Sequence, residues 1–179
     1  SLTVTINAVR PETAEQIYSW VQYRGARLTG QDAARTLLAN QWAGLSNAIE
    51  MGLLVKVNSV YLPGVNDDDL ALVAKRAGEL GADIIKADPT SDPREFHRVV
   101  QAARCPVLVR GGGKEDLQQV LMRSRQLLDQ GAVGLVYGRN VYQHRNPQAV
   151  VRALMAMIHD NASAESAWRV AGSRTTMTR

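Results

Sequence analysis

Apolar and polar residues along this chain follow two alternating patterns. Short runs rich in β-branched residues predict strands, and longer runs with apolar residues three or four positions apart predict helices. The predicted strands lie within residues 2–9, 53–62, 81–89, 105–110 and 134–137. The predicted helices cover residues 11–20, 30–51, 69–80, 91–103, 115–130 and 147–159.

This alternation predicts the fold class. Strands that alternate with helices form right-handed βαβ units, whose strands lie parallel in one sheet. We therefore expect an α/β fold with about five βα units, forming part of a (β/α)₈-type barrel. A complete barrel has eight strands and typically about 250 residues, so this chain of 179 residues is too short to close one. We expect one structural domain and a flexible tail over residues 169–179.

Composition narrows the possible functions. The chain is 45% hydrophobic with a formal charge of +4 and no basic stripe with interleaved aromatics, so we expect no nucleic-acid partner. The single cysteine, Cys105, excludes an internal disulfide and a cysteine-only metal cage within one chain, and we expect neither a metal nor a cofactor. Without a signal-peptide pattern or an apolar run near 18 residues, the sequence predicts a cytoplasmic protein with no membrane contact.

Lys86 stands at the exit of the third predicted strand, after Ile84 and Ile85. Alternate strand residues point to the same side, so Lys86 and Ile84 share a face at the sheet edge where α/β proteins bind ligands. A lysine that is partly desolvated there can attack a carbonyl as a neutral amine. The alternative is a lysine that extends from the strand end into water.

Two later strands end in glycine-containing loops. Residues 110–114 read Arg-Gly-Gly-Gly-Lys, and residues 138–140 read Gly-Arg-Asn. Glycines at strand ends let backbone N–H groups approach an anion, and the last two βα loops of such barrels often bind phosphate. A tight turn is the alternative for either loop alone. Together with Arg110, Lys114 and Arg139, the two loops favour a phosphate site.

Several other residues are expected to have structural roles. Asp67 to Asp69 match the charges that begin a helix. Trp20 and Trp42 are expected in the core. Asp88 shares a face with Lys86 and either adjusts its pKa or forms the turn before Pro89.

Residues 70–170 resemble a known family. The matching stretches are Gly81-Ala-Asp-Ile-Ile-Lys86, Pro106 through Lys114, and Tyr137-Gly-Arg-Asn-Val-Tyr-Gln143. They are similar to class I aldolases of the archaeal-type fructose-bisphosphate aldolase group, which includes the thiolase acting on phosphorylated autoinducer-2. The resemblance implies a Schiff base on Lys86. It also implies a substrate phosphate held by the backbone amides of Gly111, Gly112, Gly138 and Arg139, and Gly113 belongs to the same loop.

Residues 1–69 resemble a different family. Thr3 through Val9, Val55-Lys-Val-Asn-Ser-Val60 and Leu62-Pro-Gly-Val-Asn-Asp67 are similar to the radical-SAM protein of nitrogenase cofactor assembly. The resemblance implies that Asn58 and Ser59 lie on a strand lining a SAM cleft. The three-cysteine cluster motif of that family is absent, and one cysteine cannot hold an iron–sulfur cluster.

The two matches predict a chimera that joins near residue 69, with strand positions four and five from one barrel and six to eight from the other. The first five strands of the aldolase pattern are absent. No residue matches the acidic group on its first strand or the tyrosine proton donor on its fifth. Tyr61, near the exit of the second long strand, is a candidate substitute for that donor.

We therefore predict a class I, Schiff-base aldolase-like protein that binds a small phosphorylated sugar or ketone with impaired turnover. One alternative is a non-catalytic barrel fragment that self-associates, because an open sheet leaves two unpaired edges and an uncovered apolar face. We expect that face to include Val55, Val57, Ile84 and either Val107 or Val109, and we expect a homo-oligomer. The other alternative is a SAM-binding remnant.

Overall fold

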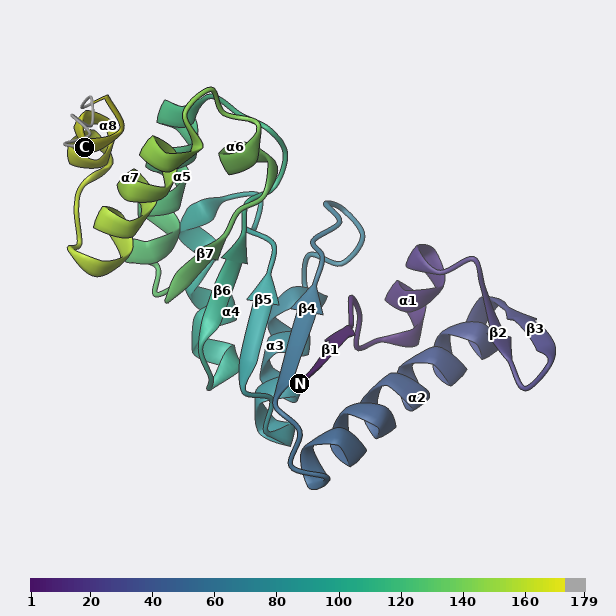
Figure 1. Cartoon of the computed structure of the whole chain (residues 1–179). Helices are drawn as coiled ribbons and strands as arrows, with labels where there is room; N and C mark the ends of the chain where they lie inside the picture. The colour runs from purple at the N-terminus through teal and green to yellow at the C-terminus, as the bar shows by residue number, and fades with distance from the viewer. Residues whose placement is uncertain (173–179) are drawn as a thin grey trace.

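Five parallel strands form the centre of the computed structural model, which describes residues 1–172 (Figure 1). The strands lie in the order β1-β4-β5-β6-β7. Their bounds are β1 Leu2–Thr5, β4 Val55–Ser59, β5 Ile84–Ala87, β6 Val107–Arg110 and β7 Gly134–Val136. The prediction of a partial barrel with five βα units is confirmed, and the sheet does not close because β1 and β7 form its two edges.

Helices connect the strands. The helices are α1 Pro11–Ile17, α2 Gly30–Glu50, α3 Asp69–Leu80, the 3₁₀ turn η1 Pro93–Glu95, α4 His97–Ala103, α5 Leu117–Asp129, α6 Arg139–Tyr142, α7 Pro147–His159 and α8 Ala164–Gly172. Helices α3 and α4 lie behind the sheet in Figure 1. None of the described helices is both long enough and apolar enough to cross a membrane.

Two local predictions were wrong. No strand was predicted around the junction of the first two predicted helices, but residues 20–29 form a hairpin of β2 Trp20–Tyr23 and β3 Ala26–Thr29. Its turn residues, Arg24 and Gly25, both have positive φ, as two-residue hairpins require. At the other end, α8 continues through Gly172 with Ala167 fully buried, so helix replaces the start of the expected tail. The rest of that tail, residues 173–179, lies outside the described residues.

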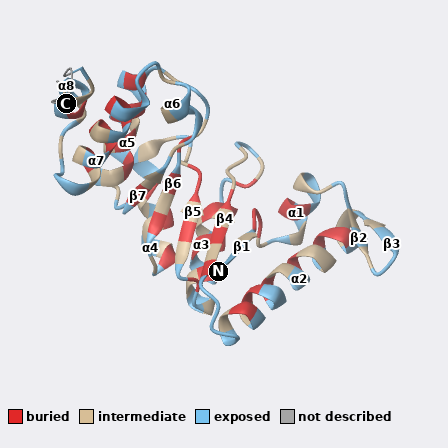
Figure 2. Ribbon diagram, in the orientation of Figure 1, coloured by how far each residue is buried: buried red, intermediate tan, exposed pale blue. Residues whose placement is uncertain are grey.

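The two faces of the sheet have different environments. The helix-covered face carries the fully or nearly fully buried side chains Val55, Val57, Ile85, Val107 and Val109. We call the opposite side the open face; it carries the half-buried side chains Lys56, Asn58, Ile84, Lys86 and Leu108. Buried and half-buried residues alternate along β4 and β5 in Figure 2.

The expected composition of the open face therefore needs a correction. Val55 and Val57 pack under the helices, because alternation along β4 places them opposite Asn58. Val107 and Val109 of β6 lie on the same helix-covered face. Of the apolar residues expected on the uncovered side, Ile84 does lie there. The open face is therefore a mixed polar and apolar surface rather than an aliphatic one.

Asp69 also has a different role from the one expected. Its side chain is fully buried, accepts the Val9 N–H at 3.1 Å and pairs with Arg10 Nε at 2.7 Å. Beside it, the buried Asn66 donates to the carbonyls of Asn7 and Val60. These contacts join the β1–α1 loop to the β4–α3 loop. Asp69 is thus a buried tertiary contact, and not only a charge at the start of α3.

Candidate active site

Lys86 lies in the middle of the sheet, on the open face. Its Cα pairs with Asn58 of β4 on one side and with Leu108 of β6 on the other. The Lys86 side chain is half-buried, and within residues 1–172 it makes no hydrogen bond or ion pair. The nearby Asn58 Oδ1 is buried and has no hydrogen-bond partner in this part of the chain. The lysine amine is therefore uncommitted.

A buried carboxylate follows Lys86 at the carboxyl end of β5. Asp88 is 7% exposed, and its Oδ1 lies 2.5 Å from Arg110 Nε. Its Oδ2 accepts the backbone N–H of Tyr61 at 3.1 Å. Burial raises the pKa of Asp88, while the charges of Arg110 and Lys86 act in the opposite direction. Asp88 therefore contributes a charged group near Lys86, in addition to preceding the turn at Pro89.

Tyr61 is committed to a different set of partners. Its hydroxyl donates to Asp67 Oδ1 at 2.5 Å and lies 2.7 Å from Ser91 Oγ. The hydrogen bond to the Asp67 carboxylate is the main reason that the pKa of Tyr61 is raised. The structure records no hydrogen bond between Tyr61 and Lys86. A proton-donor role for Tyr61 stays a prediction.

The two glycine loops are fastened together by Asn140, which is 7% exposed. Its Nδ2 donates to the carbonyls of Gly111 and Gly113 at 3.0 and 2.8 Å. Its Oδ1 accepts the Glu115 N–H at 2.9 Å. The sequence alone placed Asn140 only within the second loop. The signal available in the sequence was an asparagine directly after a Gly-Arg pair at a strand end.

Glycine is needed in the first loop for steric reasons. A Cβ on Gly111 would lie 1.7 Å from Tyr137 Cδ1, while Gly112 has a φ of +63°. The Gly111 N–H donates to the Val136 carbonyl at 3.1 Å. The donor role expected for Gly111 is therefore corrected, because its amide is already used within the sheet. Gly111 instead provides space for the Tyr137 ring.

The remaining loop amides are unpaired. In the described residues, the backbone N–H groups of Gly112, Gly113, Gly138 and Arg139 donate no hydrogen bond. The exposed Arg139 side chain reaches across to the Gly112 carbonyl at 3.4 Å. Unpaired N–H groups beside a cationic side chain are the donors that an oxyanion requires.

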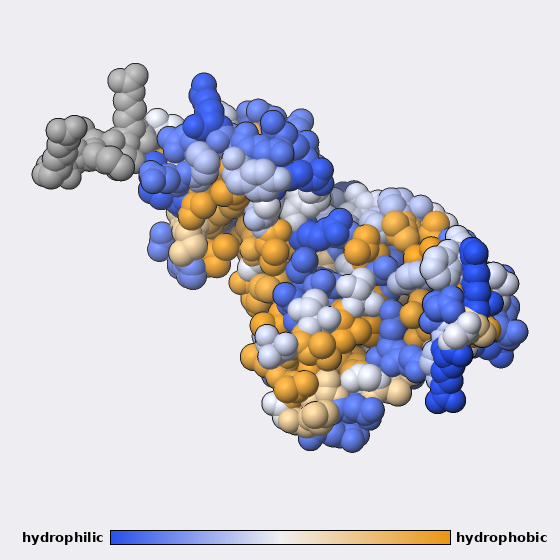
Figure 3. Space-filling view, turned by 45° about the vertical axis from the view of Figure 1, so that its right-hand side comes forward, coloured by the Kyte–Doolittle hydropathy of each residue, from blue (hydrophilic) through white to orange (hydrophobic). Residues whose placement is uncertain are grey.

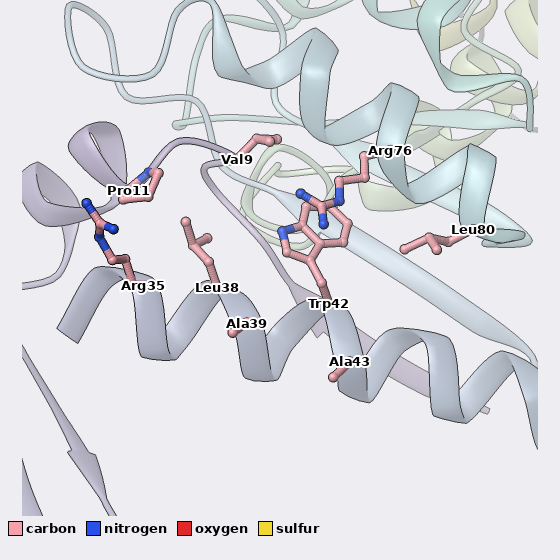
Figure 4. Close-up of a pocket in the computed structure, with 9 residues that line it drawn as sticks. All are labelled: Val9, Pro11, Arg35, Leu38, Ala39, Trp42, Ala43, Arg76 and Leu80. Atoms are coloured by element: carbon pink, nitrogen blue, oxygen red, sulfur yellow. The ribbon is translucent and has the colours of Figure 1, made fainter. Parts of the chain in front are cut away.

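A separate hollow lies between α2, α3 and the β1–α1 loop (Figure 4). Its volume is about 480 Å³. Trp42 forms part of its wall, and Arg76 stacks over the Trp42 ring at 4.5 Å. Trp42 is buried as predicted, whereas Trp20 is 50% exposed on the hairpin and the core prediction for it was wrong. Neither Lys86 nor the glycine loops line this hollow.

The fold and the site together define a class of protein. An open segment of a (β/α)-type barrel presents a free lysine and two glycine loops at the carboxyl ends of three neighbouring strands, β5, β6 and β7. The model of the DeoC/LacD family aldolases matches residues 45–144, more than half of the chain. The chain belongs to the DeoC/LacD aldolase family.

Curated relatives fall into the two groups that the sequence indicated. A FeMo cofactor biosynthesis protein NifB of Frankia alni is 47% identical over 81 residues, covering 45% of this chain and 16% of that protein. A 2-amino-3,7-dideoxy-D-threo-hept-6-ulosonate synthase of Halobacterium salinarum is 38% identical over 113 residues, covering 62% of this chain and 43% of that protein. The chain spans less than half the length of these relatives.

Solved structures show the same relationship. A crystal structure of an archaeal fructose 1,6-bisphosphate aldolase has 30% identity and a TM-score of 0.61, covering 69% of this chain and 54% of that one. A second, at 28% identity and a TM-score of 0.59, has its catalytic lysine covalently bound to a carbinolamine intermediate; 68% of this chain and 53% of that one align. Both resemblances noted in the sequence are confirmed. The chimeric join near residue 69 stays a prediction, and the family match begins upstream of it, at residue 45.

Proposed function

We propose that this protein binds a small phosphorylated sugar or ketone and forms a Schiff base with it through Lys86. The observation that carries the proposal is the position of Lys86 on β5, beside β6 and one strand further from β7, because the loops that follow β6 and β7 hold unpaired backbone amides. Its membership of an aldolase family supports the chemistry. A lysine-bound intermediate in a similar structure supports the role of the amine.

The phosphate is held by the loops. The amides of Gly112, Gly113, Gly138 and Arg139 supply the donors, and the Arg139 guanidinium supplies positive charge. Lys114, exposed at the end of the first loop, adds a second cation. Asn140 fixes the spacing of the two loops through its hydrogen bonds to the Gly111 and Gly113 carbonyls. The site therefore depends on local geometry alone.

Schiff-base formation requires more than the geometry of the two loops. Lys86 must lose a proton before its nitrogen can add to the substrate carbonyl, and desolvation favours that loss. No strand or helix of residues 1–172 lies over the open face, and Lys86 is only half-buried, so water reaches the lysine. Positioned acid–base groups contribute about 10²–10⁴-fold to such reactions, and the Tyr61 hydroxyl is held by Asp67 and Ser91. We expect slow turnover.

Reductive trapping tests this proposal. The protein is incubated with dihydroxyacetone phosphate and sodium borohydride, and the mass of the peptide containing Lys86 is measured by mass spectrometry. We expect an adduct on Lys86 that is lost in Lys86→Met and reduced by excess inorganic phosphate. A wild-type protein without an adduct, under conditions where it is folded, would contradict the proposal.

Self-association is the second candidate property, and the sheet edges favour it. Strands β1 and β7 each have one unpaired edge, and such edges pair readily with other chains. Beside β7, a hollow of about 220 Å³ is lined by apolar residues that include Leu135, Val151 and Met155. Apolar surface extends over this region of the molecule in Figure 3. Two chains that pair β7 of one with β1 of the other would cover these unpaired edges.

Sedimentation velocity tests this assembly over a range of protein concentrations. We expect a dimer that dissociates on dilution. The substitution Met155→Lys, at an exposed position of α7, should weaken the dimer. Met122→Lys, at an exposed position of α5, serves as the matched control. A monomer at the highest concentration would exclude self-association.

The similarity to FeMo cofactor biosynthesis proteins does not lead us to propose radical chemistry. Cys105 is the single cysteine of the chain, and three thiolates are needed to hold the cluster on which SAM cleavage depends. The matched region is 16% of the Frankia alni protein. The SAM-binding alternative would gain support only from SAM binding measured directly by calorimetry.

A further inference from the structure

We propose that Asp88 is the acid–base group for Schiff-base formation at Lys86; this inference rests on the proposed function. Asp88 lies two residues after Lys86, so the two side chains emerge on the same side of the chain. The Asp88 side chain is 10% exposed, and it lies where β5 ends. No other carboxylate follows Lys86 at that strand end before the turn at Pro89.

The charged groups around Asp88 come from two strands. Arg110 of β6 contacts Oδ1 at 2.5 Å, and Lys86 of β5 acts on the carboxylate through its charge. The third contact is a neutral donor, the Tyr61 backbone N–H on Oδ2. Burial opposes these groups and raises the pKa of the carboxyl. Asp88 can therefore both hold and release a proton closer to neutral pH than an exposed aspartate.

Lys86 and Asp88 are two residues apart in the chain but do not pair with each other. Lys86 and Asp88 form no ion pair within 4.0 Å in the described residues, so the amine is not neutralised by the carboxylate. The charge of Lys86 nevertheless acts on Asp88. In the proposed step, Asp88 protonates the hydroxyl of the carbinolamine that forms on the Lys86 nitrogen.

The chemical step balances as follows. The Lys86 nitrogen adds to the ketone carbon, one N–H proton moves to the carbonyl oxygen, and a neutral carbinolamine forms. Protonated Asp88 gives its proton to the carbinolamine hydroxyl, the C–O bond breaks and water leaves. The nitrogen lone pair forms the C=N bond, which produces a cationic iminium and an Asp88 carboxylate. Arg110 and the new iminium both stabilise that carboxylate.

The test measures the rate of borohydride-trapped Lys86 adduct with dihydroxyacetone phosphate from pH 5 to pH 9. We expect Asp88→Asn to slow adduct formation by about 100-fold and to remove the decline in rate that ionisation of Asp88 causes as pH rises. Asp92→Asn is the matched control, because Asp92 pairs with Arg94 in the following loop. It should follow the wild-type profile.

Chemical rescue distinguishes a proton-transfer role from a structural one. Acetate should restore part of the rate to Asp88→Ala, because it supplies a carboxyl group in the space left free, whereas a misfolded variant would not respond. An unchanged rate and pH profile in Asp88→Asn, or no acetate response in a folded Asp88→Ala, would overturn this inference while leaving the Lys86 Schiff base intact. No adduct in the wild type would overturn both.

Discussion

The two halves of the candidate site differ in how they are held. The glycine loops are cross-linked by Asn140. Arg123 of α5 holds the first loop, because its Nη2 donates to the Gly111 carbonyl at 3.0 Å. Lys86, one strand away, has no hydrogen bond or ion pair in the described residues and faces an uncovered side of the sheet. One half is fixed by its own neighbours, and the other depends on whatever covers the open face.

This difference indicates which functions a partial barrel can keep. Oxyanion binding needs a few amides in fixed positions, and two adjacent βα units provide them. Amine catalysis needs exclusion of water and a positioned proton donor. A segment of a barrel therefore retains binding more readily than turnover, and the following substitutions test that division.

Removing Asn140 should have the largest effect. Asn140→Ala deletes three hydrogen bonds and leaves the Gly111 and Gly113 carbonyls and the Glu115 N–H without this partner. We expect a loss of about 3 kcal/mol in the free energy of unfolding and loss of phosphate binding. Urea denaturation measures the first and calorimetry the second. A variant that binds phosphate as tightly as the wild type would show that the loops bind phosphate without the Asn140 hydrogen bonds.

Gly111→Ala should have the next largest effect. The added Cβ would meet the Tyr137 ring at 1.7 Å, whereas a Cβ on Gly113 meets nothing within 4 Å. We expect Gly111→Ala to cost about 1–3 kcal/mol by overpacking and Gly113→Ala to cost much less. Thermal denaturation of the two variants measures the difference in stability that the clash with Tyr137 causes. Equal melting temperatures would mean that Tyr137 moves aside freely.

Asp88 should make stability depend on pH. Because the folded state raises the pKa of Asp88, its contribution to stability is greatest below the ordinary carboxyl pKa of about 3.9. That contribution is lost as pH rises through the higher folded-state value. The free energy of unfolding of the wild type relative to Asp88→Asn should therefore fall between pH 3 and pH 7. A difference that rises with pH would indicate that the Arg110 pair outweighs burial.

Lys86→Met should change stability least, by about 0.5 kcal/mol or less. The substitution removes a charge that makes no hydrogen bond or ion pair in the described residues, and it keeps an unbranched side chain on the half-buried face. Its longer-range effect on Asp88 is small beside a direct contact. Denaturation in urea at pH 7 measures the change. A large destabilisation would reveal that the lysine holds the sheet together.

Much of the fold was predictable from periodicity, because regular burial leaves a regular pattern. Helices α3 and α7 begin and end at the predicted residues. The hairpin was missed because its turn, Arg24-Gly25, carries only one of the glycine or asparagine residues that typically mark such turns. The sides of β4 were misassigned because alternation shows which residues share a face, but not which face the helices cover.

The site was predictable in part for a similar reason. Lys86 and the glycine loops stand at strand ends, where a linear sequence shows them directly. The hydrogen bonds of Asn140 to the first glycine loop and the ion pair between Asp88 and Arg110 join residues that are distant in sequence. Such contacts depend on strand order and register, which the sequence pattern does not contain.

The central claim is that the glycine loops bind an oxyanion whether or not Lys86 can react. Calorimetric titration of inorganic phosphate into the wild type, Lys86→Met and Arg139→Ala tests it most directly. We predict equal affinity for the wild type and Lys86→Met, and binding at least about tenfold weaker for Arg139→Ala, since one charge-assisted hydrogen bond contributes about 1.5–3 kcal/mol. No binding by the folded wild type, or equal binding by Arg139→Ala, would contradict the claim.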